Sequence, residues 1–405
     1  MSSKFRNWLV GALVMCAGPE GGAVAQSFQE LETRLGDHPS LAALSHQADA
    51  SRERAIAAMG LPDPVVSAGI NNFPVFDPSF SDFLPTNKAV GLRQEFPSRA
   101  SRQASAGQAR AIAAQSERVR AAQLATLRGE LIALLHEKRR IERQRAIARR
   151  RNEKYDELAG IVEAEIDAGR PGVFRLAEIE AERAGVDRTL VELDRQDAET
   201  DARLVDLVGQ VPATPAPPVN AHDWSGHPMS FHAVRVADAD IRVANHSVEG
   251  AEAAWRPSWG AQLTYQQRET GADFAGDDWV SGKVTMTLPL WAKHSQEPRL
   301  RAAKAERASA EMRYQAAARH ASARYTSHAA QRRAAEDNIS ALKRNIAAVE
   351  DEIASQLTMY ESGAGDYAPI IDGELAILKL RADIAAQEAR RATAIARMNA
   401  LLVAP

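Results

Sequence analysis

The sequence has one cysteine and few aromatic residues. Because Cys16 is the single cysteine among 405 residues, an intrachain disulfide, a cysteine zinc site and a CxxC redox motif are all excluded. Aromatic residues make up 5% of the chain, which does not favour the aromatic-rich strands of a β-sandwich. Stability must therefore come from packing, and the frequent Ala, Arg, Glu and Gln residues favour helices.

Neither an excess of charge nor a long hydrophobic run is present. The 50 basic and 53 acidic residues give a formal net charge of -3, which offers no global electrostatic reason to bind nucleic acid, so no nucleic-acid partner is expected. Beyond residue 26 no apolar stretch approaches the roughly 20 residues that a transmembrane helix needs. These observations exclude an inner-membrane transporter, and any membrane crossing must use strands.

The motifs of the common enzyme classes are also absent. The sequence has no P-loop, dinucleotide fingerprint, nucleophile elbow or HExxH motif. His222, His227 and His232 are five residues apart, and His320 and His328 are eight apart, and neither is the i, i+4 spacing that puts two imidazoles of one helix on one metal. We therefore expect no catalytic residue, no cofactor and no structural metal.

The first 25 residues have the pattern of an export signal. Lys4 and Arg6 precede an apolar stretch over residues 8–17, and Ala23-Val24-Ala25 supplies an A-x-A cleavage site. The apolar stretch is about half the length that spans a bilayer, so we expect a cleaved signal peptide over residues 1–25.

Lipidation of Cys16 is an alternative fate for this segment. Residues 13–16 resemble a lipoprotein cleavage box, although Met15 is larger than the small residue that such a box prefers. Removal of Cys16 with the signal peptide is the favoured interpretation.

The rest of the chain contains one pattern twice. His38-Pro39 recurs as His227-Pro228, each at the start of a helix-like run. In each half an alternating strand, a polar loop, a second strand, a very long helix and a shorter helix follow. Four prolines within residues 212–218 indicate an extended linker. We expect a first repeat over 26–211, a linker over 212–226 and a second repeat over 227–405.

Two proline-free stretches predict very long helices. They run from Ser98 to about Ala168 and from about Arg299 to Ser362, and at 1.5 Å per residue each is about 100 Å long. Shorter helices are expected over residues 28–60, 174–208, 228–255 and 367–402. Two short helices laid end to end match one long helix, so antiparallel packing is expected along apolar positions such as Leu124, Leu127, Leu131, Leu134 and Leu135. A generic coiled-coil rod would share these features.

Apolar and polar residues alternate in four segments between the helices. In the second half the apolar positions are Trp259, Ala261, Leu263, Tyr265, Val284, Met286 and Leu288. The polar positions between them are Gln262, Thr264, Gln266, Lys283, Thr285 and Thr287. The first half has a weaker pattern, with Val66, Ala68 and Ile70 in one segment and Val90, Leu92 and Phe96 in the other. Such segments are typical of outer-membrane strands, although a soluble hairpin pair packed on a helix would also alternate.

Four strands are too few to close a barrel, because the smallest membrane barrels have eight. Open strand edges in lipid would leave backbone groups without partners, at a cost of several kcal/mol each. If these strands enter a membrane, several copies of the chain must share one barrel.

These features together resemble a known family. The supporting residues are the repeated His-Pro helix starts, Pro62-Asp63-Pro64 before a strand, Leu92 to Pro97 at a strand-to-helix corner, and Tyr360-x-x-Gly363 followed by Ile370-Ile371-Asp372. In this order the motifs resemble the outer-membrane factor family typified by TolC, over residues 27–403. The compact chain is most similar to the CzcC and CusC branch, which serves heavy-metal efflux.

The resemblance implies a mainly α fold with a small transmembrane β part. Family members are homotrimers in which a duplicated long-helix α-barrel continues into a twelve-stranded outer-membrane β-barrel, with four strands from each chain. They are passive exit ducts that dock a periplasmic adaptor and an inner-membrane transporter, here of the resistance-nodulation-division class. Metal cations are the expected substrate. Drug efflux and type I protein secretion remain open, as does, from a different class, a periplasmic coiled-coil adaptor or structural protein.

The same resemblance assigns roles to particular residues. The six polar strand residues named above are expected to line the barrel lumen. Asp372 and Asp366 are expected to form a carboxylate ring at the periplasmic gate, although Pro369 stands where the family usually has a second acid. An acid that merely stabilises the dipole of a helix start is the alternative for Asp372.

The helix tips contain four glycines and a tyrosine in the expected turns. Gly169, Gly172, Gly363 and Gly365 are expected to permit sharp reversals, where a positive φ is costly for other residues. Together with Tyr360 they are expected to form the adaptor-docking tips.

A basic stretch over residues 138–151 holds eight basic residues against one acid. On a soluble protein this stretch would suggest polyanion binding. On a long helix we expect a solvated face that is paired with acids of neighbouring helices.

Overall fold

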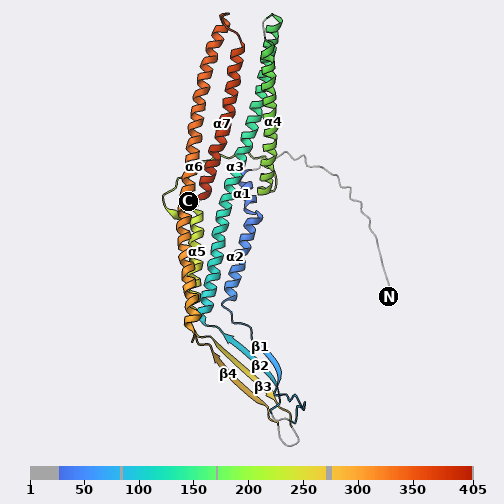
Figure 1. Cartoon of the computed structure of the whole chain (residues 1–405), viewed down its shortest axis with the longest axis vertical. Helices are drawn as coiled ribbons and strands as arrows, with labels where there is room; N and C mark the ends of the chain where they lie inside the picture. Colours follow the sequence, from blue (N-terminus) through green and yellow to red (C-terminus); the bar gives the residue numbers. More distant parts are fainter. Residues whose placement is uncertain (1–26, 83–84, 170–171, 271–275, 404–405) are drawn as a thin grey trace, which may run out of the picture.

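The computed structural model describes residues 27–82, 85–169, 172–270 and 276–403. The expected signal peptide and Cys16 lie outside these ranges, so both remain predictions. The chain is elongated, with the helices running along its length and four strands at one end (Figure 1).

Seven α-helices and four strands make up the described chain, with short 3-10 turns at Pro228–Ser230 and Ala292–His294. The first half contains α1 (Phe28–Gly36), α2 (Pro39–Ala57), β1 (Val65–Asn71), β2 (Asn87–Phe96), α3 (Arg99–Asp167) and α4 (Val173–Val208). The second half contains α5 (His232–Ala253), β3 (Trp259–Gln267), β4 (Trp279–Met286), α6 (Gln296–Glu361) and α7 (Ala368–Leu401). The prediction of a mainly helical fold with four antiparallel strands is confirmed.

The long helices α3 and α6 each pack against two shorter helices. Near the strands the contacts give the order α2, α3, α5, α6, and towards the far tips they give α4, α3, α7, α6 (Figure 1). Short helices therefore follow one another along each long helix, as the matching lengths predicted. In one copy of the chain, α6 forms one edge of this layer, and α2 and α4 form the other.

Two of the expected short helices differ from the prediction. The single helix expected over 28–60 is wrong, because the chain breaks at Asp37 and His38 between α1 and α2. Pro39 favours a helix start, and the Nδ1 atom of His38 accepts a hydrogen bond from the backbone N–H of Ser40 at 3.2 Å.

The second His-Pro pair has the same local geometry. His227 Nδ1 accepts a hydrogen bond from the backbone N–H of Met229 at 3.3 Å, and Pro228 opens a 3-10 turn, so α5 starts at His232 instead of Pro228. The repeated motif is therefore a helix-capping device in which the imidazole satisfies an amide that the helix leaves unpaired.

The predicted apolar positions of α3 are confirmed as core. Leu127, Leu131, Leu134 and Leu135 are buried in one cluster with residues of α1, α2 and α4, and Leu124 packs against it half-buried. Leu131 has no exposed surface at all. This cluster fixes α3 against α1 and α4 near the middle of the molecule.

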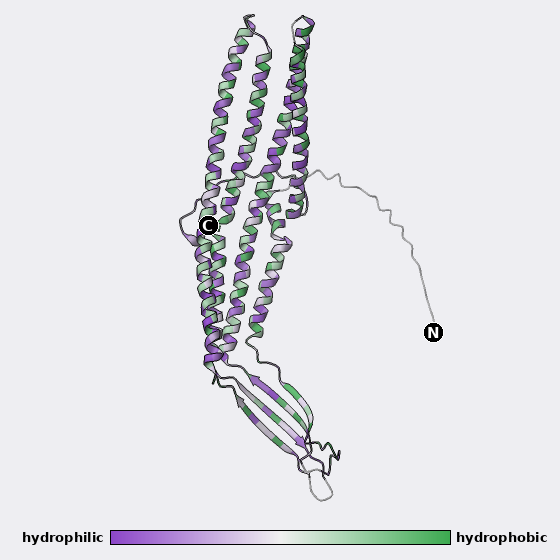
Figure 2. Cartoon of the chain, in the orientation of Figure 1, coloured by the Kyte–Doolittle hydropathy of each residue, from purple (hydrophilic) through white to green (hydrophobic). Residues whose placement is uncertain are grey.

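Hydrophobic and hydrophilic residues are interspersed along every helix (Figure 2). Within the described ranges, no helix combines the length and the apolar composition that crossing a membrane requires.

Burial is uneven between the two long helices. Fifteen of the 69 residues of α3 are buried, but only five of the 66 residues of α6, four of which are alanines. The single chain therefore leaves most of its α6 edge in contact with solvent.

The four strands form one antiparallel sheet in the order β1-β2-β3-β4. Strands β2 and β3 pair across the two halves of the chain, from Lys88 opposite Gln267 to Phe96 opposite Trp259. Every residue of the outer strands β1 and β4 is exposed. Among the residues that the structure describes, the sheet thus has two open edges and no covering layer in one copy of the chain.

Candidate functional site

The strand register separates the sheet into a polar and an apolar face. Gln262 lies opposite Arg93 on one side and Lys283 on the other, and Gly260 lies opposite Glu95 and Thr285. Since side chains alternate between faces, the predicted polar residues of β3 and β4 share one face. Thr287 lies just beyond β4, but its backbone N–H still donates to the Ser258 carbonyl at 2.9 Å.

The opposite face is apolar and uncovered. Leu263 lies opposite Leu92 and is 56% exposed. Its apolar neighbours on this face include Val66, Ala68, Ile70, Val90, Tyr265, Val280 and Val284. A contiguous apolar face of this kind in one chain indicates contact with a lipid or another protein.

On the polar face, neighbouring side chains lie close to the backbone of two glycines, Gly91 and Gly260. A Cβ atom on Gly91 would come within 2.8 Å of Ser67 Oγ, and one on Gly260 within 2.6 Å of Thr285 Oγ1. Both separations are shorter than side-chain contacts allow. A side chain at either position would therefore have to displace a neighbouring hydroxyl on the polar face.

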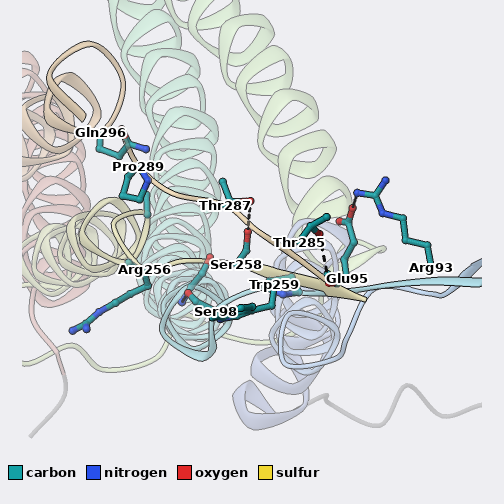
Figure 3. Close-up of a pocket in the computed structure, with 15 residues that line it drawn as sticks. Arg93, Glu95, Ser98, Arg256, Ser258, Trp259, Thr285, Thr287, Pro289 and Gln296 are labelled. Carbon is teal, nitrogen blue, oxygen red and sulfur yellow. Dashed lines mark hydrogen bonds and ion pairs between the residues drawn. The ribbon is translucent and has the colours of Figure 1, made fainter. Parts of the chain in front are cut away.

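A pocket of about 370 Å³ lies where the polar face meets the helices. Figure 3 shows Thr287 facing Ser258 and Arg93 facing Glu95, while Arg256 extends away from them. Ser258 Oγ donates to Thr287 Oγ1 at 3.0 Å, and Arg93 Nη2 lies 2.8 Å from Glu95 Oε1. This end of the sheet is polar, and Glu95 matches the charge of Arg93, so it suits passage of a solute and not tight binding of one.

Two of the four tip glycines have the positive φ that we expected. Gly169 has φ +82° and Gly363 has φ +74°, each just after the end of a long helix. This is the left-handed conformation that ends many helices.

The other two tip glycines do not, so that part of the prediction is wrong. Gly172 has φ −140°, and Gly365 is not among the residues of positive φ in the described chain. Both are constrained by close packing instead: a Cβ atom on Gly172 would lie 2.8 Å from Ile166 Cγ1, and one on Gly365 would lie 3.2 Å from Met359 Cβ. Close packing of this kind cannot be predicted from a single sequence.

Asp372 lies near the same tips and has a partner. Its Oδ2 atom is 2.5 Å from Arg175 Nη2 at the start of α4, and both side chains are more than a third exposed. Asp372 is in the second turn of α7, and the first turn of that helix contains no acidic residue. Because the helix-dipole effect fades within one turn, the ion pair explains this carboxylate better than the dipole does.

The other predicted tip residues lie nearby in the chain but not in this ion pair. Asp366 is exposed in the turn before α7. Tyr360 stacks edge-on against Tyr367, with ring centroids 5.2 Å apart. The sequence analysis missed Arg175, because its pairing with a residue almost 200 positions away depends on how the two halves meet.

Part of the sequence matches a known protein family. Residues 230–403 match the family model of the outer membrane efflux proteins. No curated protein matches the sequence.

Solved structures extend the likeness over most of the chain. CusC, studied for its folding and transmembrane channel formation, is similar with a TM-score of 0.77 and 16% identity, over 94% of this chain and 93% of its own. VceC of Vibrio cholerae, an outer membrane protein, gives a TM-score of 0.73 and 16% identity, over 92% of this chain and 95% of its own. The open-state outer membrane channel MtrE of Neisseria gonorrhoeae gives a TM-score of 0.72 and 16% identity, over 92% of this chain and 88% of its own. At these identities the likeness establishes the fold, including the half that the outer membrane efflux model does not match.

Part of the basic stretch of α3 is paired with acids of neighbouring helices, as predicted. Lys138 lies 2.5 Å from Asp201, and Arg145 lies 2.7 Å from Asp194, both on α4. Arg143 pairs with Glu388 on α7. Three of the eight basic residues of this stretch therefore join α3 to its two neighbouring helices through these ion pairs.

Two histidines outside the strands, His136 and His232, are half-buried. Burial lowers the pKa of His136 below its ordinary value, and the neighbouring Arg139 and Arg391 lower it further, against an opposing effect of its hydrogen bond to Pro217. Burial and the nearby Arg235 likewise lower the pKa of His232. Both side chains are therefore held in the neutral form at neutral pH.

Because the pKa values of His136 and His232 are lowered, we expect the folded protein to become less stable in mild acid. In the unfolded chain each imidazole titrates near pH 6.5 and binds more protons than the folded form does, so stability is lost as the pH falls through 6.5 towards the folded pKa. Each site contributes at most about 1.4 kcal/mol per pH unit. We expect the melting temperature, followed by circular dichroism from pH 7.5 to 5.5, to drop less steeply in a His136→Gln, His232→Gln double variant. The exposed His320→Gln is the matched control, and an equal slope in all three proteins would contradict the prediction.

Proposed function

We propose that this chain forms a homotrimeric outer-membrane channel that serves as the passive exit duct of a tripartite efflux system. The observation that carries the proposal is the uncovered four-stranded sheet, with one apolar face, one polar face and two open edges, at the end of a long helical layer. Such a sheet satisfies its edges and its apolar face together only when copies close into a barrel in lipid. Three chains would supply twelve strands.

The helical part supports the same assembly. The α6 edge is almost unburied in one copy, and the opposite edge is formed by α2 and α4. Packing α6 of one chain against α2 and α4 of the next continues the layer into a cylinder. The polar strand face, with Gln262, Thr264, Gln266, Lys283, Thr285 and Thr287, then lines the lumen.

The partners in this proposal are a periplasmic adaptor and an inner-membrane transporter of the resistance-nodulation-division class. The tips at Gly169, Gly172, Tyr360, Gly363 and Gly365 are the proposed adaptor-docking site, because they lie at the end of the molecule farthest from the strands (Figure 1). Asp372 and Asp366 near these tips would present carboxylates to a passing cation, which favours metal cations as the substrate.

The proposal is tested by fractionation and by single-channel recording. Expression in a Gram-negative host should yield a trimer in the outer-membrane fraction that dissociates only on heating, and the purified trimer should conduct ions in planar bilayers. A periplasmic adaptor or a structural coiled coil would be recovered as a soluble protein without conductance. Recovery of a soluble periplasmic monomer would overturn the channel proposal.

The substrate class needs a separate measurement. Deletion of the gene in its own host should raise sensitivity to heavy-metal salts while leaving sensitivity to hydrophobic drugs unchanged. The reverse pattern would leave the channel in place and assign it to drug efflux.

A further inference from the structure

A cavity of about 160 Å³ lies between α3 and α7, away from the tips and the strands. Its charged lining consists of Arg139, Arg140 and Arg143 from α3 and of Arg391 and Glu388 from α7. His136 lies beside them and is kept neutral by burial. Four arginines therefore share this space with one carboxylate.

The partners of these arginines differ. Arg143 is paired with Glu388, and Arg140 is paired with Glu137 at 2.5 Å. For Arg139 and Arg391, the described part of the chain offers no ion pair or hydrogen bond, and the Nε atom of Arg391 is buried without a partner. A buried donor of this kind is costly unless a ligand or water accepts from it.

His136 adds a second polar group next to the same space. Its Nε2 atom lies 2.9 Å from the carbonyl oxygen of Pro217 in the linker. A carbonyl can only accept, so the neutral imidazole donates through Nε2 and leaves Nδ1 with a lone pair. An anion bound beside it would favour protonation of Nδ1, which would add a donor to those of the two arginines.

We propose that Arg139 and Arg391 form a binding site for a small tetrahedral oxyanion of the phosphate or sulfate type. The guanidinium groups supply fork-shaped donors that match such an anion in two-point contacts. The cavity has room for about five water molecules at about 30 Å³ each, enough for a five-atom oxyanion.

The position of the cavity favours a free anion over a lipid headgroup. His136 is 38 residues along α3 from the strand end at Ser98, which is about 57 Å at 1.5 Å per residue. The α3–α7 contact is also in the middle of the helical layer, whose free edges are α6 and α4. A neighbouring copy that packs on those edges therefore leaves this site open.

Titration of the purified full-length protein with sodium phosphate and sodium sulfate, at constant ionic strength in chloride, tests the site. We expect a saturable rise in melting temperature and a saturable heat in calorimetry. The Arg139→Gln, Arg391→Gln double variant should bind at least tenfold more weakly. Arg149→Gln is the matched control, since Arg149 is exposed on the same helix outside the cavity.

Three results would overturn the site: no saturable response of the unmodified protein beyond that of chloride, equal affinities in the double variant and the control, or binding of an acidic peptide without binding of phosphate. An Arg391→Lys variant provides a further check that does not depend on loss of charge. It should bind more weakly than the unmodified protein and more tightly than Arg391→Gln, because an ammonium keeps the charge without the fork. Channel conductance is measured separately, so a failure of this site and a failure of the channel proposal are distinguishable.

Discussion

Replacing Leu263 by arginine is expected to prevent assembly of the trimer in the outer membrane. Leu263 lies at the middle of β3 on the apolar face, opposite Leu92 and Gly282, and is more than half exposed in one chain. An arginine on the lipid side of a barrel strand at mid-membrane costs about 2–4 kcal/mol. A trimer carries this cost three times, and each 1.4 kcal/mol is tenfold in an equilibrium. Heat-modifiable trimer in the outer-membrane fraction should fall by at least about tenfold.

The neighbouring residue provides a matched control. Thr264 is on the polar face, opposite Gly91 and Ser281, so an arginine there has space and no like charge directly across the strands. Thr264→Arg should assemble within about twofold of the unmodified protein, because a lumen residue keeps its water. Equal assembly of the two arginine variants would show that the faces are not divided between lipid and water, and would contradict the barrel assignment.

The sequence alone was sufficient for the elements that follow a simple period. Strands β1 to β4 are predictable from their two-residue alternation, and the long helices α3 and α6 from stretches without helix breakers. These patterns are local, because a side chain's face depends only on its neighbours along the chain. The apolar residues from Leu124 to Leu135 were identified as core on the same basis.

Features that depend on close approach were not predictable in this way. The break after α1 could have been inferred, since Pro39 is visible in the sequence and His38 is a possible cap. In contrast, Gly172 and Gly365 are constrained by contacts with Ile166 and Met359 and not by positive φ. Packing of a turn against its own helix depends on the folded structure. In the sequence, a glycine required by close packing cannot be distinguished from one required by a positive φ.

The candidate sites divide in the same way. The polar strand residues could be chosen from alternation, whereas the pairing of Asp372 with Arg175 joins the two halves of the chain across the tips. The cavity at Arg139 and Arg391 likewise needs α3 and α7 side by side. The sequence shows which residues are charged, whereas only the folded structure shows which of them form ion pairs.

Loss of Arg175 is expected to strengthen the block of the channel by divalent cations. In one chain the Arg175 guanidinium pairs with the Asp372 carboxylate, and it also lies 3.1 Å from Glu178. In the proposed trimer, Arg175→Ala would free three Asp372 carboxylates at the entrance, each released from a partly exposed pair worth up to about 1 kcal/mol. We expect the concentration of a divalent cation that halves single-channel conductance to fall about tenfold, with the effect weakening as ionic strength rises.

Asp372→Ala should have the opposite effect, raising the blocking concentration above that of the unmodified channel. The Arg175→Ala, Asp372→Ala double variant should match the Asp372 variant, because in this proposal the cation meets Asp372 and not Glu178, the other acid that Arg175 contacts. Arg188→Ala is the control for removal of a charge from α4, since Arg188 is exposed on the same helix well away from the tip. If Arg175→Ala and Asp372→Ala both leave the block unchanged while the channel still conducts, Asp372 is not the cation gate. If the double variant instead follows Arg175→Ala, the carboxylate that the cation meets is Glu178, the other acid that Arg175 holds.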